Sequence, residues 1–320
     1  MSTQDQDDGG DCVDELLADC LASPVSNRRA VLQGLCERHP EHADALRRRH
    51  SFLVETGLVD GPGALAAVIP DRIGGYRILR LLGQGGMGVV YLAEQESVGR
   101  QVALKLIQPG AAAPPRARER FRRELQAAAL LDHPNICAVH DAGEIEGIPY
   151  LAMRYVVGET LAERIARTRA AGDPPVTPAA IDALLELGER LARALHFAHE
   201  RGLVHRDVKP GNVMIEATSR QPLLLDFGLA HLDDVEAPVL TRSGDRIGTP
   251  AYMSPEQVAG HAVDRRTDVY ALGATLYEAL TGRVPHEAPT LEALYRRILT
   301  AEVSRLGRHN PQAPRELEIV

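Results

Sequence analysis

Tryptophan is absent from this chain of 320 residues, and only 4 phenylalanines and 8 tyrosines are present. So few aromatic side chains argue against the stacking platforms with which proteins hold single-stranded nucleic acids. The excess of Asp and Glu (44) over Lys and Arg (36) gives a formal net charge of −8, which disfavours a generally basic nucleic-acid binder. We therefore expect no nucleic-acid partner.

Cysteine is also scarce, and the four cysteines contain no Cys-x-x-Cys pair that would suggest a zinc knuckle. Nor do they suggest a disulfide framework. No apolar run approaches the roughly 20 residues needed to span a bilayer, and the polar, acidic start MSTQDQDDGGD is unlike a secretory signal. We expect a soluble, cytoplasmic chain without a membrane span, with reduced thiols at Cys12, Cys20, Cys36 and Cys137.

Hydrophobic residues make up 44% of the chain, enough to bury a large core, and its length suggests two domains. Residues 1–11 are polar and acidic, and we expect a disordered tail there. In residues 12–60, apolar positions recur at helical spacing in three segments separated by Pro24 and Pro40. This pattern predicts a helical extension, a small appendage for docking or dimer contact, and residues 61–75 are typical of a linker.

From Tyr76 onward the pattern changes to short runs rich in β-branched residues, which predict an antiparallel meander. Long segments with helical periodicity follow. Strands early and helices late, separated near residues 157–158, favour an α+β fold in which a small lobe joins a larger, mainly helical lobe, with a cleft between the lobes. The predicted strands are 76–82, 89–94, 101–107 and 149–156, and the predicted helices are 116–131, 181–201 and 268–281.

A Gly-x-Gly-x-x-Gly pattern occurs at Gly83, Gly85 and Gly88. Glycines let backbone N–H groups approach phosphate oxygens closely, although a glycine-rich turn without a ligand has the same sequence. A dinucleotide-binding fold would need a helix after these glycines, whereas the strand Val89-Val-Tyr-Leu-Ala follows. We therefore expect a hairpin that covers phosphates.

Lys105 ends the next predicted strand, and a lysine there is either a solvated edge residue or an ammonium group held over phosphates. The second role needs an acidic partner, for which Glu124 in the predicted helix 116–131 is the candidate. Glu124 would alternatively form a surface ion pair with Arg122 or Arg123, worth only about 0.2–1 kcal/mol.

Asp207, Lys209 and Asn212 lie in one short loop that contains proline and glycine, and Asp226 follows the next apolar strand. An ordinary polar turn would contain the same residue types. Asn212 and Asp226 offer hard oxygen ligands that suit Mg²⁺ on nucleotide phosphates. Asp207 is a carboxylate able to accept a proton from an incoming hydroxyl.

In their order and spacing, these segments resemble the motif set of eukaryotic-type (Hanks-type) protein kinases, and the residues of the motifs are similar to those of the bacterial serine/threonine members. The resemblance covers residues 76–320 and implies a bilobal kinase fold, with a small lobe (76–153), a hinge (154–158) and an incomplete large lobe (159–320). It also implies ATP and Mg²⁺ (or Mn²⁺) as cofactors. It rests on residues 83–90, 102–105, 205–212, 226–228 and 254–256.

The resemblance also implies a role for each matching residue, since phosphoryl transfer in this family depends on positioning and charge neutralisation. Asp207, Lys209, Lys105 and Glu124 would be catalytic, Asn212 and Asp226 would hold the metal ions, and Asp268 would brace the catalytic loop. The expected nucleotide-binding residues are Leu82, Gly83, Gly85, Gly86, Gly88, Val90, Ala103, Lys105, Met153, Tyr155, Val156 and Met214.

Lys209 and the pair Gly248-Thr249 resemble the serine/threonine form of the family. The implied function is therefore ATP:protein phosphotransfer to Ser and Thr hydroxyls of protein substrates in signal transduction. We also expect self-association and autophosphorylation at Thr241 and Ser243, with Arg206 as the cation that pairs with the new phosphate.

Glu256 raises an alternative, because relatives pair this glutamate with an arginine in later helices and no residue here matches it. The final residues 314–320 resemble the beginning of a helix, so either the chain is truncated or Glu256 has another partner. A buried carboxylate without a partner would cost about 3–5 kcal/mol. A pseudokinase or nucleotide-binding scaffold is therefore the alternative function, with a small-molecule kinase as a more distant one.

Overall fold

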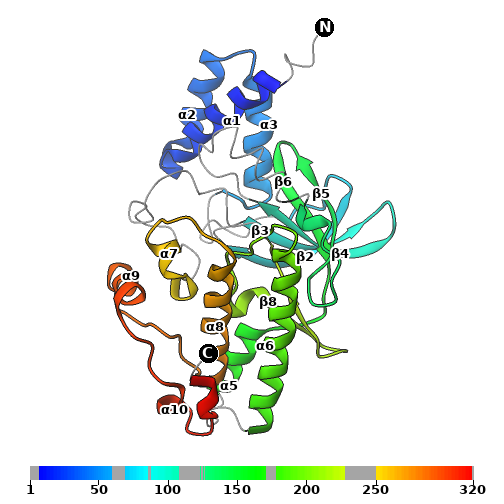
Figure 1. The fold of residues 1–320 in the computed structure, drawn as a ribbon. Coiled ribbons are helices and arrows are strands. Elements are labelled where there is room, and N and C mark those ends of the chain that lie inside the picture. Colours follow the sequence, from blue (N-terminus) through cyan, green and yellow to red (C-terminus); the bar gives the residue numbers. More distant parts are fainter. Residues whose placement is uncertain are drawn as a thin grey trace. The chain divides into compact units, whose positions relative to one another are not determined.

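The structure is a computed structural model that describes residues 7–59, 69–85, 88–107, 123, 125, 127–170, 178–227 and 250–318 (Figure 1). The chain divides into two compact units. The first unit holds the described residues up to 125 and residues 139–155, and the second holds the remaining described residues. The division after Tyr155 falls inside the segment 154–158 that we expected to be a hinge.

Three helices open the first unit: α1 (Asp7–Ala22), α2 (Val25–Arg38) and α3 (Ala43–Glu55). They match the three helical segments expected in residues 12–60, and Pro24 occupies the N-cap position of α2. Helix α1 begins at Asp7, so the expected disorder of residues 1–11 is wrong from residue 7 onward. Acidic residues favour a helix N-terminus, and burial of Val13 and Leu17 anchors the turns that follow.

The first unit also contains an antiparallel sheet, in which the described strands follow the order β1-β2-β3-β4-β6-β5. The meander predicted for residues 76–107 is present as β2, β3 and β4. Strand β1 lies inside the expected linker 61–75, and β5 was not predicted. The strands are β1 (Arg72–Ile73), β2 (Tyr76–Gly85), β3 (Gly88–Gln95), β4 (Arg100–Ile107), β5 (Val139–Ile145) and β6 (Ile148–Arg154).

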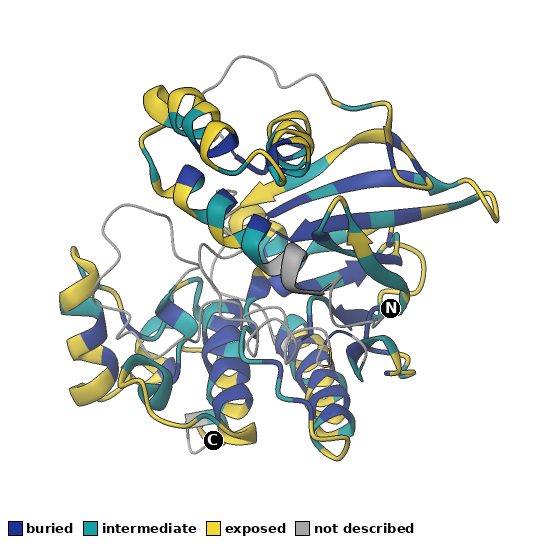
Figure 2. Ribbon diagram, turned by 90° about the horizontal axis from the view of Figure 1, so that it is seen from above, coloured by how far each residue is buried: buried dark blue, intermediate teal, exposed yellow. Residues whose placement is uncertain are grey.

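The two faces of this sheet have different surroundings. On β4, Val102, Leu104 and Leu106 are fully buried and alternate with Ala103 and Lys105, which point to the opposite face. The first face shares one hydrophobic core with α1, α2 and α3, and its buried residues are visible along the strands in Figure 2. The helical extension therefore packs on one face of the sheet and leaves the Lys105 face uncovered by these helices.

The second unit is mainly helical, as expected for the large lobe. Helices α5 (Leu161–Ala170), α6 (Pro178–His199) and α8 (Arg265–Thr281) share a core with a small antiparallel sheet of order β7-β8-β9. Its strands are β7 (Gly158–Thr160), β8 (Val213–Glu216) and β9 (Pro222–Leu224). Shorter helices are α7 (Pro255–Val258), α9 (Leu291–Thr300) and α10 (Leu306–His309).

Helices α6 and α8 correspond to the predicted helices 181–201 and 268–281. The helix predicted for 116–131 lies largely outside the described residues. The expected helix start near residue 314 is a 3₁₀ turn, Arg315–Glu318, over the residues that the structure describes.

Gly158, the first residue of β7, lies at a point of close backbone approach. Strand β7 pairs with β8, and a Cβ atom at residue 158 would lie 2.1 Å from the Ile215 carbonyl oxygen. Only glycine fits here without moving a strand.

Within the described part of the chain, no helix combines the length and the apolar character that crossing a membrane requires.

Candidate active site

The loop that carries Asp207 is braced by a buried carboxylate on α8. Asp268 is fully buried, and it accepts hydrogen bonds from the backbone N–H groups of His205 (2.8 Å) and Arg206 (2.7 Å) and from His199 Nε2 (2.6 Å). Burial alone would raise the pKa of Asp268, but these donors hold it below its ordinary value. A buried anion needs several donors, and these donors fix the beginning of the loop.

The same loop brings three predicted residues together. Lys209 Nζ lies 2.7 Å from Asp207 Oδ2 and 3.0 Å from Oδ1. Asn212 Nδ2 donates to the Asp207 carbonyl (2.8 Å) and to Asp207 Oδ2 (2.9 Å). The Asp207 side chain remains 22% exposed, so a hydroxyl group from outside can reach a carboxylate that an ammonium and an amide already hold in place.

The loop also fixes the backbone next to Asp226. The Leu225 N–H donates to the Asn212 carbonyl (2.9 Å), and the Leu225 carbonyl accepts from His205 Nε2 (2.8 Å). This bond requires the ring proton on Nε2, while Nδ1 accepts from the Asp207 N–H (3.3 Å). Asp226 follows with a positive φ of 61°, a backbone conformation that aspartate adopts more readily than most residues.

The donor atoms of Asn212 and Asp226 fit a hard divalent cation. Asn212 uses its nitrogen toward Asp207, so its amide oxygen can serve as a ligand beside the Asp226 carboxylate. Within the residues that the structure covers, no group of three or more His, Cys, Asp or Glu could hold a metal ion. Two protein oxygens suit an ion whose other ligands are phosphate oxygens and water.

In the first unit, the predicted nucleotide residues of the sheet share one face. Val90 pairs with Lys105 across β3 and β4, and Ala103 pairs with Met153 across β4 and β6. Lys105 is only 4% exposed. The face therefore presents one ammonium group among apolar side chains, which suits a ligand with a flat apolar part and an anionic part.

The glycine-rich hairpin joins β2 and β3. Gly83 pairs with Val90, Gly85 pairs with Gly88, and Gly88 has a φ of 131°, which favours glycine. Leu82 precedes these glycines on β2 and is half-buried. Gly86 lies outside the described residues.

The remaining predicted nucleotide residues follow β6 or lie on β8. Tyr155 accepts a hydrogen bond from Arg80 at 3.1 Å, and Val156 is buried. Met214 is half-buried on β8, opposite Leu223 of β9. The predicted residues that lie outside the described part of the chain are Glu124, Thr241, Ser243, Gly248 and Thr249.

Glu256 is not the buried carboxylate without a partner that we considered. It is half-buried and accepts a hydrogen bond from the Thr267 hydroxyl at 2.7 Å. Burial would raise its pKa, but hydrogen bonds from Thr267, its own backbone and Ser254 hold the pKa of Glu256 below its ordinary value. Ser254 and Gln257 also form a capping box on α7, which the Ser-x-x-Gln spacing could have revealed.

Two supporting residues were not predicted from the sequence. His199 donates to Asp268, and Gln257 Nε2 donates to the Arg206 carbonyl at 2.9 Å. The residues join segments that are 69 and 51 positions apart, respectively, and no local pattern marks such pairs.

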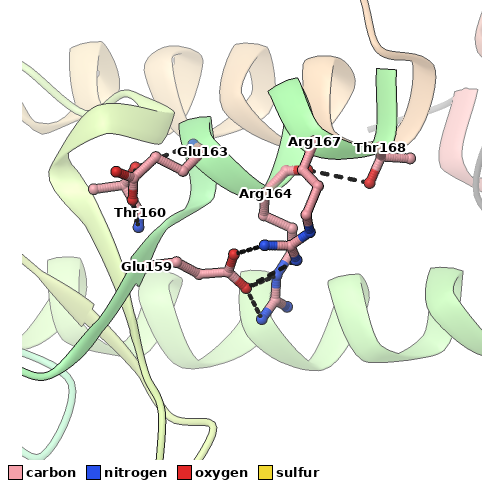
Figure 3. Close-up of polar contacts among 6 residues, drawn as sticks. All are labelled: Glu159, Thr160, Glu163, Arg164, Arg167 and Thr168. Carbon is pink, nitrogen blue, oxygen red and sulfur yellow. Dashed lines mark hydrogen bonds and ion pairs between the residues drawn. The ribbon is translucent and has the colours of Figure 1, made fainter. Parts of the chain in front are cut away.

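Glu159, Arg164 and Arg167 form an ion-pair cluster in the second unit (Figure 3). Glu159 accepts hydrogen bonds from Arg167 and, at 3.0 Å, from Arg164 Nε. The bond from Arg167 is the main cause that lowers the pKa of Glu159 to about 2, so this carboxylate stays ionised at neutral pH. Thr160 and Glu163 form a capping box at the start of α5, which orients the helix that carries both arginines.

Comparison with known proteins agrees with this arrangement. Residues 76–317 match the family described as protein kinase domain. The chain is 38% identical over 252 residues to the serine/threonine-protein kinase PrkC of Bacillus subtilis, covering 78% of this chain and 37% of that protein. It is 43% identical over 214 residues to the serine/threonine-protein kinase PknB of Mycobacterium tuberculosis, covering 66% of this chain and 33% of that protein.

The crystal structure of the Mycobacterium tuberculosis PknI kinase domain is also similar, with a TM-score of 0.57 and 35% identity. The match covers 75% of this chain and 83% of that domain. The two-unit α+β architecture expected from the sequence is thereby confirmed. The chain spans less than half of the length of the curated relatives, so the comparison concerns their kinase region.

Proposed function

Because this chain belongs to the protein kinase family and is similar to its bacterial serine/threonine members, we propose that it transfers the γ-phosphoryl group of ATP to Ser and Thr hydroxyls of proteins. The observation that carries the proposal is the loop 205–212, which holds Asp207 with an ammonium and an amide group while its carboxylate stays accessible.

Asp207 acts as the base of the proposed reaction. Its carboxylate orients the acceptor hydroxyl and takes its proton as the hydroxyl oxygen attacks the γ-phosphorus. Lys209, which already lies against this carboxylate, carries the positive charge that steadies the transferred phosphoryl group. A divalent ion, which we propose to be Mg²⁺ (or Mn²⁺), would be held by Asn212 and Asp226 and would neutralise charge on the phosphate oxygens.

The first unit supplies the nucleotide-binding groups in this proposal. Backbone N–H groups of residues 83–88 cover the phosphates, and Lys105 contacts them with its ammonium group, paired with Glu124. The apolar residues of the Lys105 face accept the adenine base. They are Val90, Ala103 and Met153. Tyr155 of the first unit, and Val156 and Met214 of the second, are the remaining residues that we propose to contact the nucleotide.

The proposed acceptors are protein substrates, and we include autophosphorylation of Thr241 and Ser243 in an associated pair of chains. Arg206 next to Asp207 is the proposed partner of that phosphate. A cytoplasmic location is proposed because none of the four cysteines forms a disulfide in the part of the chain that the structure describes.

Transfer itself tests the proposal. The chain is incubated with Mg-ATP, with and without a generic basic acceptor protein, and phosphoserine and phosphothreonine are measured. Asp207→Asn should lower the rate by about 10²–10⁴-fold, the range for loss of a general base. The matched control is Asp182→Asn on the exposed side of α6, which should leave the rate unchanged.

Two outcomes would overturn the proposal. ATP binding without any transfer would favour the pseudokinase alternative, and transfer that survives Asp207→Asn would remove this residue from the reaction.

A further inference from the structure

The residues that follow α3 lie against the glycine-rich hairpin of the sheet. Residues 56–59, which we term the docking segment, turn back on the helix, where the N–H groups of Leu58 and Val59 both donate to the Leu53 carbonyl (2.9 and 3.2 Å). Thr56, Leu58 and Val59 are buried, and Leu58 and Val59 share a core with Val89 and Tyr91 of β3. The helical extension thus ends in a compact turn that packs on the hairpin.

Two hydrogen bonds join the docking segment to the hairpin. Tyr91 donates its hydroxyl to the Thr56 carbonyl at 2.9 Å in a buried position, and Gln84 Nε2 donates to the Gly57 carbonyl at 2.6 Å. Burial raises the pKa of Tyr91, so its hydroxyl remains a donor at neutral pH. One bond comes from each strand of the hairpin, β2 and β3.

These contacts lie close to the turn of the hairpin. Gln84 immediately precedes Gly85, which pairs with Gly88 where the two strands meet. Glycines leave this backbone with more conformational freedom than other residues would, so conformational entropy is lost when a ligand orders the hairpin. The hydrogen bond of Gln84 already restricts the backbone next to Gly85, so less entropy remains to be lost when a ligand binds.

A second contact holds the helical extension at the β5–β6 turn. Arg48 lies 4.0 Å from Glu146, and the Arg49 guanidinium lies 2.5 Å from the position that a Cβ at Gly147 would occupy. Arg49 also forms an ion pair with Asp14 of α1. Polar contacts therefore join the helical extension to the sheet at the glycine-rich hairpin and at the β5–β6 turn. The docking segment makes the first set of contacts, and α3 makes the second.

We propose that the docking segment positions the glycine-rich hairpin, through Tyr91 and Gln84, so that the affinity for ATP depends on how α1–α3 pack on the sheet. This inference rests on the proposed function, because only a nucleotide-binding hairpin has an ATP affinity to adjust. Tyr91 and Gln84 are positioning residues, since each acts through the backbone of the hairpin. The helical extension becomes a control element for nucleotide binding.

The test uses the full chain with the double substitution Gln84→Ala and Tyr91→Phe. Because two hydrogen bonds that position the hairpin are lost, we expect the KM for ATP and the Kd of a fluorescent ATP analogue to rise about fivefold or more. The KM for the acceptor protein and kcat should change by less than about twofold, because only the nucleotide side is loosened.

The matched control is Gln95→Ala with Tyr150→Phe. It removes the Gln95–Arg100 bond (2.7 Å) and the Tyr150–Asp141 bond (2.9 Å) in the same unit, away from the docking segment. Its ATP affinity should equal that of the wild type. Leu58→Ala provides a third variant on the helical side, outside the expected nucleotide residues, and should raise the Kd for the ATP analogue in the same direction.

Amide hydrogen exchange gives a readout that needs no catalysis. Exchange of residues 82–90 should be faster in the double variant than in the control, whereas exchange of residues 205–212 should not change. Equal ATP affinity or equal exchange in the two double variants would overturn the inference. If the wild-type chain binds ATP but transfers no phosphate, the proposed transfer is overturned, and the comparison of ATP affinity between the two double variants still decides the inference. If the wild-type chain binds no ATP, both the proposed function and the inference are overturned.

Discussion

The loop 205–212 and the glycine-rich hairpin are held in place by different means. The loop depends on side chains, above all Asp268, which accepts hydrogen bonds from the first two backbone N–H groups of the loop and from His199 of α6. The hairpin depends on strand pairing and on an apolar face shared with α1–α3. Electrostatic networks give a single fixed geometry, whereas a glycine-rich backbone on an apolar face keeps freedom to adjust. Under the proposed function, the loop would hold a fixed base and the hairpin would be an adaptable cover for the phosphates.

The largest effect should follow from breaking the brace of the loop. Asp268→Ala leaves His199 and the N–H groups of His205 and Arg206 without their acceptor, which should lower the free energy of unfolding by about 3–5 kcal/mol and abolish transfer. Thermal unfolding followed by circular dichroism, together with the transfer assay, measures both effects. Asp264→Ala, which removes an exposed N-cap carboxylate of the same helix, should cost only about 0.5–2 kcal/mol. Equal losses in the two variants would show that the brace has no special role.

An intermediate effect should follow from weakening the apolar face of the hairpin sheet. Leu104 is fully buried, so Leu104→Ala should lower the free energy of unfolding by about 2–5 kcal/mol through the cavity that it leaves. If the two regions are independent, hydrogen exchange should rise in residues 76–107 and stay unchanged in residues 205–212. Exchange that rises equally in both regions would contradict the comparison.

The smallest effect concerns Thr267, whose hydroxyl donates to Glu256. Thr267→Val should cost about 1 kcal/mol at pH 7, and Thr267→Ser, which keeps the hydroxyl, should cost less. A carboxylate with a lowered folded pKa stabilises the fold above its unfolded pKa, and this contribution disappears as the pH falls through the folded pKa. Denaturant unfolding at pH 7 and pH 3 should therefore show the Val variant approaching the wild type in acid. A difference that persists undiminished at pH 3 would rule out this charge-assisted bond.

Much of this architecture could be predicted from residue patterns. Alternating apolar residues gave β2–β4, and helical periodicity gave α1–α3, α6 and α8, because burial on one face imposes these periods. Strand β5 (VHDAGEI) lacks such alternation and exists because the Glu146-Gly147 turn, with both φ angles positive, pairs it with β6. The short strand β1 likewise depends on its partner β2.

In the candidate site, contacts between residues close in sequence could be predicted, whereas contacts between distant segments could not. Asp207, Lys209 and Asn212 lie within one loop, so their spacing alone predicted their proximity. The hydrogen bond from His199 to Asp268 and that from Gln257 to the Arg206 carbonyl depend on how distant segments pack, which no local pattern specifies. The hydroxyl partner of Glu256 was missed because the resemblance directed attention to an arginine, whereas Thr267 lies 11 positions away in a different segment.

The hydrogen bonds to both peptide groups of Leu225 have a consequence for protein engineering. They set the spacing of residues 212 and 226 through the main chain, independently of which side chains these positions carry. If Asn212 and Asp226 hold a divalent ion as proposed, exchanging the Asp226 carboxylate for a softer ligand should change which cation binds while the surrounding loop keeps its shape. Under that proposal, ion preference becomes a property that single substitutions at these positions can alter.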